Sequence, residues 1–209
     1  MSVIERTAPG RLAGHRIGIL MESDYVEPEI SYYRLRFAEE GADVTLYTRL
    51  WGQPSLTFTG HEHQAPLTVD GDLETLDYPA LSHLSALIVP GGMVADRLRY
   101  SEDPEEPAPA VQVLRRAFRL PNLVKGIICH GLWLLAPAAD LVAGRAVTCH
   151  NNLVADARLM GARYVGQDVV VDDDLVTGRS ADVCHLFAAA VVAQVLARRA
   201  AVAERGDHD

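Results

Sequence analysis

The chain is poor in lysine and has no run of basic residues. Only one of the 19 lysine and arginine residues is lysine, Lys125, and 28 acidic residues give the 209-residue chain a net charge of -9. Proteins that bind nucleic acid or anionic membranes concentrate positive charge on one face, and this sequence gives no sign of such a face. We therefore expect neither nucleic acid nor a membrane as a partner.

The sequence also has few cysteines and lacks long apolar runs. Three widely spaced cysteines, Cys129, Cys149 and Cys184, are an odd number, which argues against a disulfide framework. No apolar run reaches membrane-spanning length, and residues 1–13 carry charged, proline and glycine residues where a signal peptide would need a hydrophobic stretch. We therefore expect a cytoplasmic location.

The composition is that of one globular domain. Hydrophobic residues make up 49% of the chain and charged residues 22%, which is enough apolar surface for one sizeable core. Residues 1–14 lack periodicity and predict a flexible lead-in. Residues 15–200 form the expected domain, and residues 201–209 are a polar C-terminal tail.

The order of the predicted elements indicates a parallel sheet. Residues 16–21 predict a buried strand, a helix follows from Pro28 until Gly41, and residues 42–47 alternate as a second strand. A strand, helix and strand within about thirty residues form a βαβ unit. The expected fold is a flavodoxin-like three-layer α/β/α sandwich with a mostly parallel central sheet.

Later segments extend this pattern, and one stretch interrupts it. Residues 51–78 are weakly patterned and predict a hairpin or excursion at one sheet edge. The further predicted elements are strands at 84–89, 123–128 and 146–149, helices at 110–119, 153–160 and 181–199, and a hairpin of 168–172 with 175–177 across Asp173 and Asp174.

Cys129 stands at the most informative turn of the sequence. It directly follows the buried strand 123–128, and an apolar, alanine-rich segment after Gly131 predicts a helix to about Ala139. A sharp strand-to-helix turn exposes a nucleophile, and backbone N–H groups and the helix dipole there favour a thiolate. The alternative is a buried apolar cysteine.

Two other stretches belong at the same edge of the predicted sheet. The carboxyl ends of parallel strands meet, which brings Glu29 and the turn Pro90-Gly91-Gly92 towards Cys129. A protonated Glu29 would donate a hydrogen bond to the thiolate and lower its pKa, whereas an ionised Glu29 would raise it. Alternatively, Glu29 is an acid that favours the first turn of its helix.

Glu29, Pro90-Gly91-Gly92 and Ile128-Cys129-His130-Gly131 together resemble the DJ-1/PfpI superfamily in order and spacing. The resemblance extends from about Arg16 to Arg198 and implies the class I glutamine amidotransferase-like fold. It implies that Cys129 is the nucleophile, that His130 is a general acid or base, and that Glu29 tunes the thiolate.

The resemblance also implies the remaining parts of the site. The backbone N–H groups of Gly92 and His130 would hold an oxyanion. Asp96 of a neighbouring subunit would orient His130, although the family usually has glutamate there and a solvated helix acid is an equal reading. A homodimer or higher oligomer follows. The predicted catalytic residues are Cys129, His130, Glu29 and Asp96, and the predicted oxyanion or substrate-binding residues are Gly91, Gly92, Gly131 and His150.

The histidines do not predict a metal site. His61 and His63 could supply two ligands at strand spacing, but no third ligand lies nearby in the sequence. Each cysteine precedes a histidine, His130, His150 or His185, yet the spacing matches no compact zinc pattern. We expect neither a metal nor another cofactor.

The predicted function follows from the resemblance. It implies a cofactor-independent cysteine enzyme that acts on a small electrophilic carbonyl compound, as a glyoxalase III-like or deglycase-like hydrolase or lyase. A PfpI-type peptidase and an isocyanide hydratase-like or biosynthetic enzyme are alternatives, although Leu132 replaces a frequent proline and leaves the subfamily open. The alternative of another class is a redox sensor or stress-protective protein in which Cys129 is oxidised.

Overall fold

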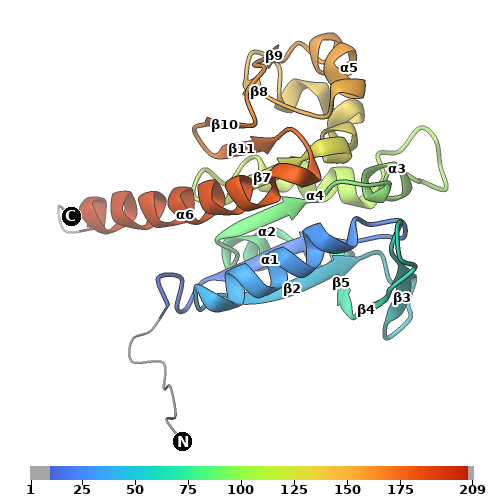
Figure 1. Ribbon diagram of the computed structural model, residues 1–209, viewed down its shortest axis with the longest axis horizontal. Coiled ribbons are helices and arrows are strands. Elements are labelled where there is room, and N and C mark those ends of the chain that lie inside the picture. Colours follow the sequence, from blue (N-terminus) through green and yellow to red (C-terminus); the bar gives the residue numbers. More distant parts are fainter. Residues whose placement is uncertain (1–9, 207–209) are drawn as a thin grey trace, which may run out of the picture.

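A mostly parallel sheet forms the centre of the computed structural model, which describes residues 10–206 (Figure 1). Its seven strands lie in the order β10-β11-β7-β6-β1-β2-β5, and only the β10–β11 pair is antiparallel. The strands are β1 (Arg16–Leu20), β2 (Asp43–Thr48), β5 (Gly71–Asp72), β6 (Ala86–Val89), β7 (Val124–Ile128), β10 (Val169–Asp172) and β11 (Leu175–Gly178).

Helices cover both faces of this sheet, as the three-layer prediction requires. One face carries α1 (Glu27–Glu39) and α6 (Cys184–Gly206), which pack against each other (Figure 1). The other face carries α2 (Tyr78–Ser82), α3 (Val94–Leu98) and α4 (Pro109–Ala117). Because β6, β7 and β11 are covered on both faces, all their residues are buried, including the apolar runs that predicted them.

Two small sheets flank the central one. β3 (Leu56–Thr59) and β4 (Pro66–Val69) form the antiparallel hairpin expected within residues 51–78, and only β5 of that stretch joins the main sheet. β8 (Ala146–Val147) and β9 (Arg163–Tyr164) form a parallel pair. The remaining short elements are η1 (Leu73–Thr75), η3 (Asn151–Leu153), α5 (Val154–Leu159) and η4 (Ala181–Val183).

The segment after the nucleophile turn differs from its prediction. Instead of an α-helix, Cys129–Leu141 (η2) is a 3₁₀ helix, with non-helical dihedral angles at Ala138. Pro137 lies inside this segment, and proline removes a backbone donor and clashes with the preceding helical turn. The apolar pattern correctly predicted burial, because Leu132, Leu134 and Leu135 join the core.

The ends of the domain extend beyond the expected boundaries. Residues 10–14 form turns that bury Leu12 completely, although we predicted a flexible lead-in, and α6 continues to Gly206. Residues 1–9 and 207–209 lie outside the described residues. Contrary to expectation, Ala181–Ala200 is long and apolar enough to span a membrane by length and composition alone. In this fold its residues Phe187 and Val191 are buried in the core of the sheet domain, and 28% of the apolar window lies inside the protein.

Candidate active site at Cys129

Cys129 lies at a sharp turn at the carboxyl end of β7. It follows Ile128 directly and has a φ of 58°, a left-handed conformation that is uncommon for residues other than glycine. Cys129 is buried, with only 7% of the residue exposed to solvent. Backbone strain of this kind is typical of functional turns, and the geometry agrees with the turn that the sequence predicted.

Glu29 approaches this turn from the first turn of α1. Its carboxylate is buried and accepts hydrogen bonds from the Gly91 amide at 3.1 and 3.2 Å. Burial raises the pKa of Glu29 to about 7, while the Gly91 amide and, more weakly, the Tyr33 hydroxyl act in the opposite direction. Glu29 is therefore divided between its protonated and ionised forms near neutral pH.

The glycines after β6 allow Glu29 and Cys129 to come together. A Cβ atom at Gly91 would lie 2.9 Å from Cβ of Cys129 and 2.9 Å from Oε2 of Glu29, so no larger residue fits without a shift. Gly92 has a φ of 74°, which favours glycine. Gly131 packs against the carbonyl oxygens of Val89 and Pro90. The structure thus brings the predicted stretches to one edge of the sheet.

Three backbone N–H groups, acting as hydrogen-bond donors, lower the pKa of the Cys129 thiol. They belong to His130, Ala181 and Gly92. The family resemblance implied the amides of His130 and Gly92, whereas the amide of Ala181 was not predicted. Ala181 begins η4 shortly after β11, which neighbours β7, so the rule that parallel strands end at one edge could have identified it.

The pKa of Cys129 differs from the sequence-based expectation. Burial and the nearby Glu29 carboxylate raise it to about 11, although the three amides lower it. The expectation of a thiolate at neutral pH underestimated how strongly burial disfavours the charged form. Near neutral pH the group is therefore a thiol rather than a thiolate.

His130 provides a base within reach of the thiol proton. Its Nδ1 lies 3.3 Å from Sγ of Cys129, a contact that adjacency in sequence did not guarantee. The ring of His150 lies against it, with the two ring centroids 4.5 Å apart and the planes 30° apart. Burial, and secondarily His150, lower the pKa of His130, so it is neutral and able to accept a proton at pH 7.

Unlike the other predicted catalytic residues, Asp96 does not come together with Cys129. It lies exposed on α3, and no side-chain hydrogen bond connects it with His130 within residues 10–206. Its neighbour Arg97 forms an ion pair with Asp24 instead. The predicted contact runs between subunits, so the role of Asp96 stays a prediction.

The other cysteines and histidines do not join the site as a cluster. Cys149 is buried and Cys184 is partly exposed at the start of α6. The loop residues His61 and His63 are exposed, as is His185 in α6. Among the described residues, no group of three histidine, cysteine or acidic side chains is arranged to hold a metal ion.

Comparisons with known proteins identify relatives of this chain. Protein/nucleic acid deglycase 2 of Escherichia coli is 29% identical over 168 residues, which cover 80% of this chain and 90% of that protein. General stress protein 18 of Bacillus subtilis is 31% identical over 175 residues, covering 81% and 91%. Among solved structures, Schizosaccharomyces pombe DJ-1 superposes with a TM-score of 0.72 at 17% identity, covering 86% of this chain and 91% of that one.

The family-level comparison covers most of the domain. Residues 15–194 match the DJ-1/PfpI family, and this range includes Glu29, the glycine turn and Cys129. The matched range also contains every strand of the central sheet. The chain is therefore a member of the DJ-1/PfpI family.

Proposed function

We propose that this cysteine enzyme of the DJ-1/PfpI type acts on a small electrophilic carbonyl compound. The observation that carries the proposal is the convergence on one sulfur of a neutral histidine and three backbone N–H donors. Relatives named deglycase support an enzyme of this type. The reaction class, glyoxalase III-like or deglycase-like, is part of the proposal.

The first chemical step can be written from these groups. As Sγ of Cys129 forms a bond to the carbonyl carbon, the π electrons of the carbonyl move to its oxygen, and the thiol proton moves to Nδ1 of His130. The Gly92 and His130 amides, which already face the sulfur, lie within reach of the developing oxyanion. Return of the proton from His130 to that oxygen gives a neutral hemithioacetal.

Glu29 controls the charge next to the sulfur in this scheme. Protonated Glu29 leaves the sulfur free of a neighbouring negative charge, whereas ionised Glu29 opposes thiolate formation. Because its pKa of about 7 lies near neutrality, Glu29 changes form within the working pH range of a cytoplasmic enzyme. We propose a cytoplasmic location for this enzyme as well.

The proposal also includes a homo-oligomer. Asp96 is exposed on α3 and is available to a second copy of the chain, in which it would orient His130. Light scattering on the purified protein tests this point. A monomer that keeps full activity would remove Asp96 from the mechanism.

Turnover of methylglyoxal is the direct test of the enzyme. We expect catalytic consumption by the wild-type protein and its loss in Cys129→Ser, with Cys184→Ser as the control because that thiol does not receive the same amides. Equal activity in Cys129→Ser would refute the proposal.

A redox sensor is the second candidate, and one observation favours it. The three amides that face the sulfur would also stabilise the anionic oxygens of a sulfinate formed by peroxide. A sensor would react once with peroxide and would not consume methylglyoxal catalytically. Mass spectrometry of the Cys129 peptide, together with the turnover assay, separates the two functions.

A further inference from the structure

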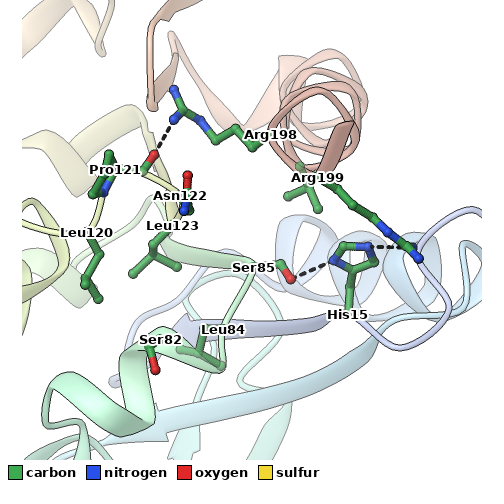
Figure 2. Close-up of a pocket in the computed structure, with 11 residues that line it drawn as sticks. His15, Ser82, Leu84, Ser85, Leu120, Pro121, Asn122, Leu123, Arg198 and Arg199 are labelled. Carbon is green, nitrogen blue, oxygen red and sulfur yellow. Dashed lines mark hydrogen bonds between the residues drawn. The ribbon is translucent and has the colours of Figure 1, made fainter. Parts of the chain in front are cut away.

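A cavity lies at the opposite edge of the sheet from Cys129. It has a volume of about 500 Å³ and opens where β1, β6 and β7 begin (Figure 2). His15, Ser85 and Leu123 line it, and each directly precedes one of these three strands. We call it the α6 cavity. It lies at the start of β7 and Cys129 at the end, so the two are separated by the length of this five-residue strand, about 16 Å.

The α6 cavity combines an apolar wall with positive charge. Leu84, Leu123 and Val195 are buried and form apolar parts of its lining, while Arg198 and Arg199 extend from α6 (Figure 2). No acidic side chain is among the described residues that line it. A volume of this size is typical of sites for small organic ligands.

The two arginines differ in how their charge is compensated. Arg198 forms an ion pair with Asp173 at 2.6 Å and also donates to the carbonyl oxygen of Pro121 (Figure 2). Arg199 forms no ion pair with any carboxylate that the structure describes, and its hydrogen-bond partner there is Nε2 of His15 at 3.4 Å. Among the described residues, no carboxylate therefore pairs with Arg199 at the cavity, in a chain with a net charge of -9.

The hydrogen bonds next to Arg199 run in one direction. A guanidinium group can only donate, so Nε2 of His15 accepts and the proton of the neutral ring resides on Nδ1. Nδ1 then donates to Oγ of Ser85 at 2.7 Å (Figure 2). The hydroxyl hydrogen of Ser85 is left for an acceptor, and the chain of donors that begins at Arg199 polarises it.

We propose that the α6 cavity binds an organic carboxylate with a compact apolar body, of the aryl carboxylate class, independently of the site at Cys129. The carboxylate accepts from the guanidinium of Arg199 and the hydroxyl of Ser85, and the apolar body lies against Leu84, Leu123 and Val195. An inorganic anion would leave the apolar wall unused, and a neutral aromatic molecule would leave the charge of Arg199 unused.

Isothermal titration calorimetry on the full-length protein tests this proposal with 2-naphthoate and its neutral analogue 2-naphthamide. We expect naphthoate to bind more tightly than the amide. Arg199→Gln should weaken naphthoate binding at least tenfold and change amide binding little, because it removes a charge-assisted hydrogen bond. Arg163→Gln, the same charge change at an exposed site on β9, is the matched control and should have no effect.

Three further variants locate the ligand. Ser82 is exposed and lines the cavity, so Ser82→Trp should fill the space and abolish binding of both compounds. Ser85→Ala should weaken naphthoate binding by about two- to tenfold. Cys129→Ser should leave binding unchanged, so a failed methylglyoxal assay and a failed binding assay are separate results.

Several outcomes would overturn the proposal. Equal affinity for naphthoate and naphthamide, or equal effects of Arg199→Gln and Arg163→Gln, would exclude recognition of the carboxylate. Binding that survives Ser82→Trp but is lost in Cys129→Ser would assign the ligand to the candidate active site. No measurable binding at millimolar naphthoate would exclude the ligand class.

Discussion

Replacement of Glu29 by glutamine isolates the effect of one buried charge on Cys129. Oε2 of Glu29 and Sγ of Cys129 lie 2.9 and 3.4 Å from the same point, the position of a Cβ atom at Gly91. The two atoms are therefore no more than about 6 Å apart, where two unit charges interact with about 0.7 kcal/mol at a dielectric constant of 80 and about 3 kcal/mol at 20.

The direction of the effect follows from the order of the two pKa values. Glu29, with a pKa of about 7, is ionised in the pH range where Cys129, with a pKa of about 11, titrates. Glutamine removes the negative charge and keeps an oxygen that can accept from the Gly91 amide. The acid dissociation constant of the Cys129 thiol should therefore increase about 3- to 100-fold in Glu29→Gln.

The rate of iodoacetamide alkylation as a function of pH measures this change. Peptide mass spectrometry would follow Cys129 separately from Cys149 and Cys184, and the midpoint for Cys129 should move to lower pH in the variant. Glu105→Gln, in an exposed loop, is the control for loss of one negative charge. An unchanged or higher midpoint in Glu29→Gln would refute the reasoning, since it would mean that the ionised carboxylate does not oppose the thiolate.

Three further predictions concern other charged groups. His150→Phe keeps an aromatic ring against His130 but removes the imidazole that lowers the pKa of His130 electrostatically, so this pKa should rise in an NMR titration, and an unchanged value would exclude the coupling. Lys125→Met breaks a buried ion pair with Asp174 and should cost about 3 kcal/mol of unfolding free energy in urea, and a loss below about 1 kcal/mol would contradict it. Although burial raises the pKa of Glu27, backbone amides, chiefly those of residues 62 and 63, lower it to about 2. Its contribution to stability is thus present above pH 4.5 and lost as the pH falls towards 2, and Glu27→Gln should abolish this part of the pH dependence in urea unfolding.

The features that sequence predicted are those set by local pattern. The buried strand before Cys129 and the glycines after β6 carry their signals in adjacent residues, and the parallel-strand rule then brings Glu29 to the same edge. The hairpin across Asp173 and Asp174 was predicted for the same reason.

The features that sequence missed depend on tertiary burial. The raised pKa of Cys129 arises from the surrounding core and from Glu29, which lies 100 positions earlier in the chain. The contact between the rings of His130, in η2, and His150, just before η3, joins residues that lie twenty positions apart in the sequence. The sequence also did not predict the 3₁₀ conformation of Cys129–Leu141. The prediction of a helix there rested on the apolar pattern and gave too little weight to Pro137.

The single lysine has a consequence for the surface chemistry of this protein. Lys125 is fully buried and held by Asp174, so the folded chain exposes no ε-amino group to solvent. Aldehydes and other carbonyl compounds modify proteins by condensing with such amines, and here the lysine that could form a Schiff base is shielded by the core. Amine-reactive labels should accordingly mark the α-amino group of the native protein and reach Lys125 only after unfolding, which makes this residue a built-in reporter of global opening.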